Sequence, residues 1–255
     1  MSRAHWLTRV RPVELAELLK TLTGVSYGEF AIYGRTWYLD PVSNFGQRLL
    51  SDGSYEPEAT SAFLSLLRPG DVFLDIGANE GWFSVRAAEK VGERGRAVAI
   101  EPQARLWPVI LRNFMLNRLH NYVLAPYAAG SAEGFVDILL YPSLNTGASS
   151  LVPQRRTKAR QRQKAGVLRL DQICRIHGIS SVRLAKIDVE GFELEVLRGA
   201  GDLLGRQIEH LFVELHPPQL AALGQSPGEV EDLLRTRGYR QREVGGVHVW
   251  SLQSA

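Results

Sequence analysis

The sequence predicts an α/β protein with a Rossmann-like fold, in which a seven-stranded, mostly parallel sheet ends in an antiparallel hairpin. From residue 71 onward, short apolar runs alternate with segments of helical periodicity, as they do where crossover helices join parallel strands. The first apolar run, 72–76, passes through a glycine-rich turn into a helix. The last two runs are separated only by Gly245 and Gly246, which is typical of a hairpin.

Length and composition fit one large domain. The chain has 255 residues, of which 45% are hydrophobic and 22% charged, so it can bury a substantial core. The net charge of +3 is too small to indicate a polyanionic partner. The single cysteine, Cys174, excludes internal disulfides and a cysteine zinc cluster and is compatible with a reducing cytoplasm. Charged residues interrupt residues 1–20, so we expect no signal peptide, no transmembrane segment and a cytoplasmic location.

Residues 1–70 are expected to form an N-terminal segment of helices and a hairpin, followed by the main domain over 71–255. Residues 1–24 have the pattern of one amphipathic helix, and we expect its apolar face to pack on the domain's own core. A membrane-surface helix or a homodimer contact is the alternative. A hairpin is predicted at 33–40 and a helix at 57–67, which Pro69 and Gly70 end.

The main domain is predicted to alternate strands and helices around one insertion. The strands are expected at 72–76, 97–101, 121–125, 183–188, 209–214, 239–244 and 247–252, and the first two crossover helices at 81–91 and 103–117. The insertion, 126–171, contains candidate strands at 135–141 and 166–171 and a polar turn at 145–151. Residues 155–164 carry six basic residues and no acidic ones, which predicts a solvated loop; contact with a phosphorylated, acidic or nucleic-acid substrate is the alternative.

The turn after the first strand has the pattern D-x-G-x-N-x-G, made by Asp75, Gly77, Ala78, Asn79 and Gly81. Glycine lets the backbone approach a ligand closely. The dinucleotide fingerprint G-x-G-x-x-G is not matched, and the Asp75 carboxylate would repel a pyrophosphate but attract a sulfonium or ammonium group, which disfavours a dehydrogenase. Glu101 ends the next strand, where an acid accepts hydrogen bonds from a ribose. Both acids fit a cationic, ribose-bearing cofactor, and the turn resembles the S-adenosylmethionine site of class I methyltransferases.

A second group of charged residues follows two later strands. In an extended chain the side chains of Lys186, Asp188 and Glu190 share one face, and Glu214 and His216 share one side of the next strand. A buried parallel strand is expected to be apolar on both faces, so charged residues at its carboxyl end are unusual and indicate a specific role. We expect the five side chains to converge beside the glycine turn as a functional site. Ion pairs and helix caps that only hold the strand ends are the alternative.

Taken together, these motifs resemble the FkbM family of S-adenosylmethionine-dependent O-methyltransferases over about residues 27–251. The matching elements are 75–81, Glu101 with Pro102, Asn113 with Asn117, 145–147, 170–171, the K-I-D-V-E-G run at 186–191 with Glu193, and Glu214 with His216. The family methylates hydroxyl groups of sugars, polyketides and other natural products.

The resemblance also implies a class I methyltransferase fold and roles for individual residues. Its cofactor-binding residues would be Asp75, Gly77, Ala78, Asn79, Gly81, Glu101, Pro102 and Asn117, with Asp188 near the amino acid end or the methyl group. Residues 1–70 would cover the cofactor, with Tyr55 and Glu56 as part of that cover.

Our hypothesis for the reaction is an SN2 transfer of the sulfonium methyl group to an acceptor hydroxyl. His216 is the expected base because an unperturbed histidine pKa near 6.5 suits neutral pH. Asp188 would position the hydroxyl, and Lys186 would hold the acids or stabilise the developing alkoxide. Asp188, Glu190 and Glu214 are also hard oxygen ligands that suit Mg²⁺, which leaves a metal-assisted version open.

Two other functions compete with this hypothesis. The basic residues of 155–164 favour a nucleic-acid methyltransferase. Enzymes that methylate the amino groups of nucleic-acid bases resemble one another in an Asn-Pro-Pro-aromatic or Asp-Pro-Pro-aromatic element at the end of the fourth strand, and this chain does not have that element there. A non-catalytic module that binds the cofactor is the second alternative, which the intact acids and histidine disfavour. We therefore expect a small-molecule or carbohydrate acceptor that carries a hydroxyl.

Overall fold

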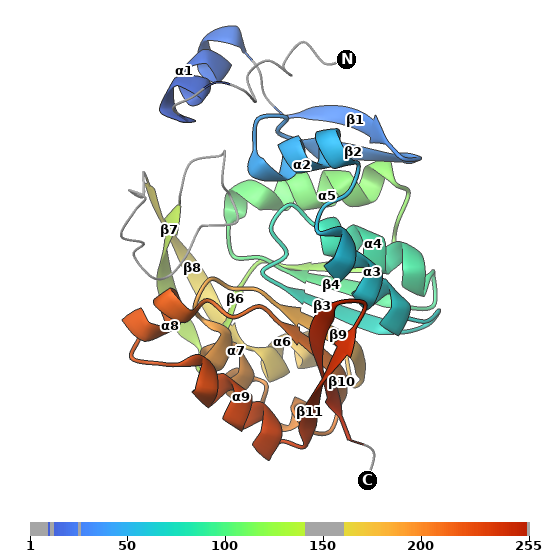
Figure 1. Cartoon of the computed structure of the whole chain (residues 1–255), viewed down its shortest axis with the longest axis vertical. Helices are drawn as coiled ribbons and strands as arrows, with labels where there is room; N and C mark the ends of the chain where they lie inside the picture. The colour runs from blue at the N-terminus through green and yellow to red at the C-terminus, as the bar shows by residue number, and fades with distance from the viewer. Residues whose placement is uncertain (1–9, 11–12, 25–26, 141–160, 254–255) are drawn as a thin grey trace.

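Seven strands form the central sheet, in the order β11-β12-β10-β9-β3-β4-β5 (Figure 1). The computed structural model describes residues 10, 13–24, 27–140 and 161–253. The strands are β3 (Val72–Ile76), β4 (Arg96–Ile100), β5 (Tyr122–Ala125), β9 (Val182–Ile187), β10 (Ile208–Val213), β11 (Tyr239–Val244) and β12 (Val247–Leu252). Each lies within one residue of its predicted position, so the predicted α/β fold is confirmed.

The order of the strands creates a crevice at the middle of the sheet. From β3 the chain steps outward to β4 and β5 and then returns to the other side of β3 with β9 and β10, all in parallel. Loops that leave β3 in one direction and β9 in the other open a crevice at the carboxyl ends of these strands. β12 runs antiparallel to both β10 and β11, and Gly245 and Gly246 join the hairpin with φ of 57° and 84°.

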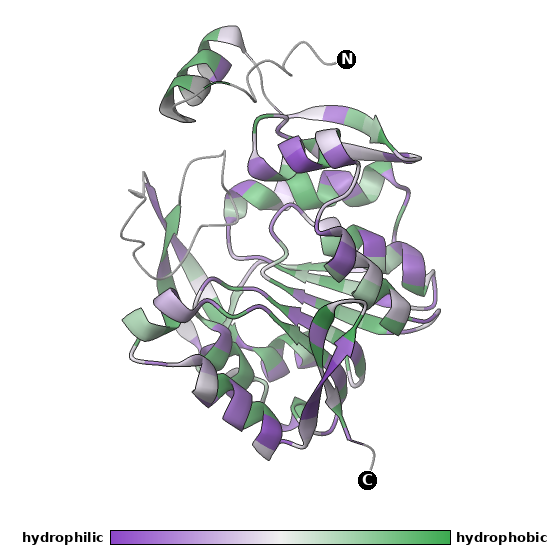
Figure 2. Cartoon of the chain, viewed as in Figure 1, coloured by the Kyte–Doolittle hydropathy of each residue, from purple (hydrophilic) through white to green (hydrophobic). Residues whose placement is uncertain are grey.

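Helices cover both faces of this sheet. One face packs against α3 (Pro57–Leu66), α4 (Trp82–Val91) and α5 (Trp107–Leu116), and the other against α6 (Leu170–Ile176), α7 (Glu193–Gly199), α8 (Pro217–Ala222) and α9 (Pro227–Thr236). Successive residues of β3 belong to the two cores in turn, because side chains of a strand alternate between its faces. Figure 2 shows the inner strands of the sheet largely hydrophobic, the edge strand β11 largely hydrophilic, and the helices hydrophobic on one part of their surface only.

The hairpin and one helix of the N-terminal segment differ from the prediction. The hairpin of β1 (Gly28–Ile32) and β2 (Arg35–Leu39) begins before the expected 33–40 and has its turn at Tyr33 and Gly34. The helix α2 (Asn44–Asp52) was not predicted. The residues at its two ends are typical of helix caps. The Ser43 hydroxyl accepts a hydrogen bond from the Gly46 N–H at 2.9 Å, and Gly53 ends the helix with a φ of 69°.

The first helix, α1 (Val13–Thr23), does not bury its leucines. Leu15, Leu18 and Leu22 are 42%, 54% and 72% exposed, so the expectation that they pack on the domain's own core is wrong. The helix instead contacts the rest of the chain through an ion pair between Lys20 and the buried Asp40. Among the described residues, we find no helix with both the length and the apolar character that crossing a bilayer requires.

The insertion folds into a small sheet of its own. Its strands, in the order β6-β8-β7, are β6 (Ala128–Gly130), β7 (Gly134–Leu140) and β8 (Gln161–Arg169). β8 includes 161–164, so the expectation of a solvated loop is wrong for this part of the basic stretch: Arg162 and Lys164 are exposed, while Gln163 and Ala165 occupy the more buried face. The polar turn at 145–151 and residues 155–160 lie outside the described residues.

A buried histidine in β10 makes the stability of this fold depend on pH. His210 is 5% exposed and lies 3.0 Å from the Ser251 hydroxyl of β12. Burial lowers its pKa to about 4; Glu209 opposes this shift, whereas Arg183, Arg242 and Arg68 add to it. In the unfolded chain His210 becomes protonated near pH 6.5, whereas in the folded chain it stays neutral down to about pH 4. The stability that depends on neutral His210 is therefore lost as the pH falls from about 6.5 to 4.

We therefore expect the free energy of unfolding of the wild type to fall by about 1–3 kcal/mol more than that of His210→Gln between pH 7 and pH 4.5. Urea unfolding at both pH values measures this difference. The comparison between the two proteins removes the contributions of other acids, which titrate in both. Parallel pH dependence of the two proteins would contradict the expected role of His210.

Candidate active site

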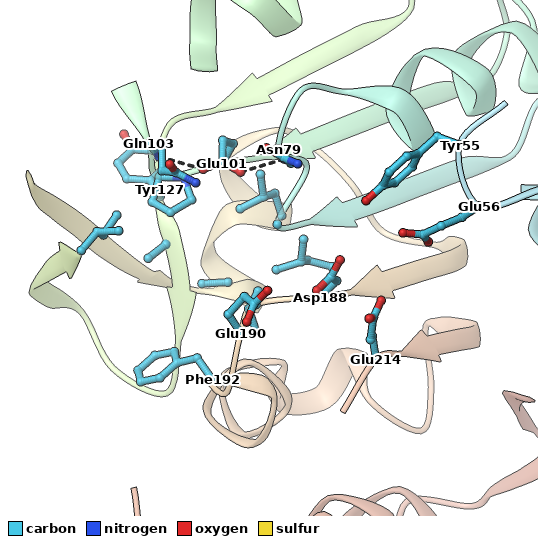
Figure 3. Close-up of a pocket in the computed structure, with 18 residues that line it drawn as sticks. Tyr55, Glu56, Asn79, Glu101, Gln103, Tyr127, Asp188, Glu190, Phe192 and Glu214 are labelled. Carbon is cyan, nitrogen blue, oxygen red and sulfur yellow. Dashed lines mark hydrogen bonds between the residues drawn. The ribbon is translucent and has the colours of Figure 1, made fainter. Parts of the chain in front are cut away.

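A pocket of about 220 Å³ opens at the carboxyl ends of β3, β4 and β9, at the crevice in the sheet (Figure 3). Nine residues expected from the sequence line it, namely Tyr55, Glu56, Gly77, Asn79, Glu101, Pro102, Asp188, Glu190 and Glu214. Figure 3 shows Glu101, Gln103 and Tyr127 toward one end and Tyr55, Glu56 and Glu214 toward the other. The pocket is therefore long, with acidic side chains concentrated toward one end.

The glycine turn brings β3 against the end of β9. Gly77 has a φ of 85°, and a Cβ atom there would lie 1.9 Å from the carbonyl oxygen of Asp188. The N–H groups of Gly77 and Ala78 both donate to the carbonyl of Ile100, at 2.9 and 3.2 Å. Glycine at this position therefore lets three strand ends meet around the pocket.

Backbone N–H groups of two different loops hold the carboxylate of Glu101. Its carboxylate, 2% exposed, accepts hydrogen bonds from the N–H groups of Asn79 at 2.8 Å and Gln103 at 2.9 Å. Burial raises the pKa of Glu101 to about 7, although these two hydrogen bonds lower it. Each carboxylate oxygen has a second lone pair, so the group can still accept hydrogen bonds from the hydroxyls of a ribose.

Four of the expected cofactor residues are not among those that line the pocket, namely Asp75, Ala78, Gly81 and Asn117. Asp75 is fully buried behind it and accepts a hydrogen bond from the Ser84 hydroxyl at 2.6 Å. Burial raises the pKa of Asp75, and the nearby Lys186 opposes the shift. Ala78 is buried, and Gly81 is the N-cap of α4. Asp75 is thus placed to act electrostatically on Lys186.

Asn117 has a different place from the one expected. Its amide nitrogen donates to the Thr36 carbonyl at 2.9 Å, and its amide oxygen accepts from the Thr36 N–H at 3.3 Å. Asn113 accepts from the Tyr38 N–H at 2.7 Å and donates to the Glu80 carbonyl at 2.9 Å. The two asparagines, four residues apart on one face of α5, fasten β2 to this helix, so their spacing indicated a shared partner but not the cofactor.

Lys186 and Asp188 form an ion pair at the end of β9. Lys186 is 4% exposed, and its Nζ atom lies 2.8 Å from Asp188 Oδ2 and 4.8 Å from the centre of the Phe83 ring. Burial lowers the pKa of Lys186, but the charges of Asp188 and Asp75 outweigh burial and raise it above its ordinary value. The lysine is therefore a permanent cation that orients Asp188 toward the pocket.

His216 lies behind the acidic end of the pocket, surrounded by carboxylates. Its Nδ1 atom is 2.8 Å from Glu193 Oε1, and its Nε2 atom is 3.8 Å from oxygens of both Asp188 and Glu190 and 4.0 Å from Glu214. Burial lowers the pKa of His216, but the hydrogen bond to Glu193 and the neighbouring acids outweigh it and raise the pKa to about 9. The choice of His216 as base rested on an unperturbed pKa near 6.5, and these acids shift the pKa away from that value in the direction that favours the protonated ring.

Glu190 and Glu214 complete the acidic end. Burial raises the pKa of Glu190 to about 7, since His216 only partly offsets burial and the repulsion of Asp188, Glu214 and Glu193. Burial also raises the pKa of Glu214. Glu190 has a φ of 53°; like Glu56 and Asn79, it is a lining residue held in the left-handed region, where side chains other than glycine are strained. Such strain is concentrated at functional sites.

The same residues also have the spacing of a cation site. Asp188, Glu214 and His216 offer ligand atoms that lie within 4.8 Å of one another. Carboxylate oxygens suit Mg²⁺, but a histidine ligand must be neutral, so a metal has to displace the proton that the acids hold on His216.

Several residues of the site were not assigned a role from the sequence. Gln103, Tyr127, Ile138 and Phe192 line the pocket, and Glu193 supports His216. Among these, only Gln103 could have been found from the sequence, because it lies two positions after Glu101, the acid expected to bind a ribose. Tyr127 and Ile138 belong to the insertion, whose place over the pocket only the folded chain reveals.

Comparison with known families and curated proteins identifies relatives of this chain. The family model described as the methyltransferase FkbM domain matches residues 75–241. The methyltransferase sdnD of Sordaria araneosa is 29% identical over 200 residues, which covers 67% of this chain and 74% of the relative. The 31-O-demethyl-FK506 methyltransferase FkbM of Streptomyces tacrolimicus is 29% identical over 197 residues, which covers 68% and 74%.

Solved structures of similar architecture are more distant. An S-adenosylmethionine-dependent methyltransferase from Aquifex aeolicus is 17% identical, with 80% of this chain and 90% of that chain covered and a TM-score of 0.43. Fibrillarin from Aeropyrum pernix, determined with natively bound S-adenosylmethionine, is 14% identical, with 88% and 81% covered and a TM-score of 0.43.

Proposed function

The chain belongs to the FkbM methyltransferase family, and from that premise we propose that it methylates a hydroxyl group of a small molecule, a sugar or another natural product. It is an S-adenosylmethionine-dependent methyltransferase with a class I fold. The pocket is the main support for this proposal. Glu101, an acid placed to bind a ribose, lies toward one end, and titratable acids such as Glu190 lie toward the other. The name of the FkbM relative, a methyltransferase of 31-O-demethyl-FK506, supports methyl transfer to oxygen.

The cofactor would lie along the length of the pocket. Glu101 would accept hydrogen bonds from the ribose hydroxyls, and the turn at Gly77 and Asn79 would face the methionine part. Asp188 and Glu56 would attract the ammonium and sulfonium groups, because opposite charges at short range favour binding. Tyr55 and Glu56 come from residues 1–70, which supports the proposal that this segment covers the cofactor.

For the chemical step we propose Glu190 as the base. A base must lie within hydrogen-bond reach of the proton it removes, and Glu190 lines the pocket with a pKa of about 7. Bound S-adenosylmethionine would supply the methyl group and leave as S-adenosylhomocysteine, and the Glu190 carboxylate would take up the proton that the acceptor hydroxyl loses to the transfer. Protonated His216, held by Glu193, would keep Glu190 ionised, and Asp188, oriented by Lys186, would position the hydroxyl. Glu214 would hold the acceptor at the open side.

The test is a transfer assay with methyl-labelled S-adenosylmethionine and separate pools of hydroxylated, amine and RNA acceptors. We expect label on hydroxylated small molecules, at a carbon whose NMR shift identifies an O-methyl group, and release of S-adenosylhomocysteine in equal amount. Label on RNA, with binding that weakens steeply as salt rises, would favour the nucleic-acid alternative. Cofactor binding without transfer to any pool would favour the non-catalytic alternative.

The same assay with a chelator separates the two versions of the chemistry. Turnover that persists in EDTA is expected if side chains alone activate the hydroxyl. Turnover that EDTA abolishes and Mg²⁺ restores would assign Asp188, Glu214 and His216 to a metal instead.

A further inference from the structure

A glutamine in the insertion holds the loop that follows the ribose-type acid. Gln163, on the more buried face of β8, donates a hydrogen bond from Nε2 to the Pro102 carbonyl at 2.7 Å. Its Oε1 atom accepts one from the Ala104 N–H at 3.0 Å. One side-chain amide therefore holds the peptide groups on both sides of Gln103, although Gln163 and Gln103 are far apart in the sequence.

The residue between these two contacts reaches both the acid and the pocket. The Gln103 N–H donates to Glu101 Oε1 at 2.9 Å, and the Gln103 side chain lines the pocket. The indole N–H of Trp107 donates to the Glu101 carbonyl at 2.8 Å. Because Gln163 holds the loop on either side of Gln103, it fixes the direction of an N–H that orients the Glu101 carboxylate.

The partner of Gln163 in the neighbouring strand is also part of the pocket. Gln163 pairs directly with Ile138 of β7, and directly opposite residues of antiparallel strands point to the same face. Ile138 is 2% exposed and lines the pocket. One cross-strand pair of the insertion sheet thus supplies an apolar wall for the cofactor and a polar contact to the loop beside it.

We infer that Gln163 is a positioning residue for the nucleoside part of S-adenosylmethionine, acting through the loop at 102–104 on Glu101. This inference rests on the proposed assignment of Glu101 to the cofactor ribose and is independent of the acceptor. Residues 161–164, which the sequence marks only by their basic charge, therefore serve the cofactor through Gln163, whose side chain is partly buried and bonds the loop, whereas the other three are exposed.

The test measures binding of S-adenosylhomocysteine by calorimetry, with no acceptor present. We expect Gln163→Ala to raise the Kd about tenfold, since two hydrogen bonds to the loop are lost. In the separate transfer assay with an acceptor, kcat at saturating cofactor should change less than about twofold. The matched control is Gln161→Ala, which removes an exposed glutamine from the same strand and should leave the Kd unchanged. Thermal unfolding of each variant shows that it is folded.

A second variant separates positioning from packing. Gln163→Glu keeps an acceptor for the Ala104 N–H, but an ionised carboxylate cannot donate to the Pro102 carbonyl, whereas a protonated carboxyl can. The Kd of Gln163→Glu relative to wild type should therefore improve as the pH falls, and a residue that only fills space would not show this recovery. Wild-type affinity in a folded Gln163→Ala, or an equal loss in Gln161→Ala, would overturn the inference. Absence of binding by the wild type would instead contradict the cofactor site itself.

Discussion

Glu190→Gln is expected to lower kcat by about 10²–10⁴-fold, because it removes the proposed base while keeping the shape of the side chain. The amide cannot take up the proton of the acceptor hydroxyl, yet it still fits beside Gln219, whose amide lies 3.1 Å from Glu190 Oε2. The affinity for S-adenosylhomocysteine should change only a few-fold, since the proposed role of Glu190 is in the chemical step. Single-turnover transfer and calorimetry measure the two quantities separately.

The pH dependence of kcat gives an independent measure of the same assignment. Glu190 must be ionised, so activity should rise as the pH passes its pKa of about 7. His216 must stay protonated, so activity should fall again as the pH passes about 9. The groups that face these two side chains are Asp188, Glu193 and Glu214, together with Gln219. A bell-shaped profile between about 7 and 9 is therefore expected.

The control for Glu190→Gln is Glu58→Gln, which changes an exposed glutamate at the start of α3 and should leave kcat unchanged. If Glu190→Gln turned over at the wild-type rate and activity rose through pH 9 without falling, His216 would be the base after all. That outcome would support the sequence-based hypothesis that His216 is the base and contradict the proposal that Glu190 is.

Gly77→Ala should have the largest effect on the folded state. The new methyl group would lie 1.9 Å from the Asp188 carbonyl oxygen, and the residue would keep a φ of 85°. A backbone oxygen cannot move away as a flexible side chain can, so β3 and β9 must separate where the pocket lies. We expect the free energy of unfolding to fall by about 3 kcal/mol or more and the binding of S-adenosylhomocysteine to be lost.

The matched control for this variant is Gly92→Ala. Gly92 also has a positive φ, 66°, but a Cβ atom there has no atom within 4 Å. Its ψ of −177° places it in a region that essentially only glycine adopts, so the variant should cost only the backbone strain, about 1–3 kcal/mol, and leave binding intact. Urea unfolding and calorimetry on both variants separate the clash from the strain. Equal losses in the two variants would show that conformation alone, and not the contact with Asp188, sets the cost at Gly77.

The main sheet could be predicted from the sequence because its signals are local. Strand periodicity, the glycine turn at 77–81 and the hairpin at Gly245 and Gly246 are each contained in a few neighbouring residues. Acids at the ends of parallel strands follow from the same signals, since those ends meet at one edge of the sheet. For this reason the strand pattern alone predicts that Glu101, Asp188, Glu190 and Glu214 lie close together, and all four line one pocket.

The state and role of individual side chains depended on the tertiary structure, because burial and charge act through space. His216 is a cation because Glu193, Asp188 and Glu190, which lie before it in the sequence, surround it in the fold. Asp75 is sealed behind the pocket wall, and Asn117 is bonded to β2. Gln163 reaches the loop at 102–104 only once the insertion has folded over the pocket. The sequence by itself determined the family, the sheet and the acids that line the pocket; desolvation and long-range contacts, which no local pattern records, decided which side chains carry charge and which hold the others in place.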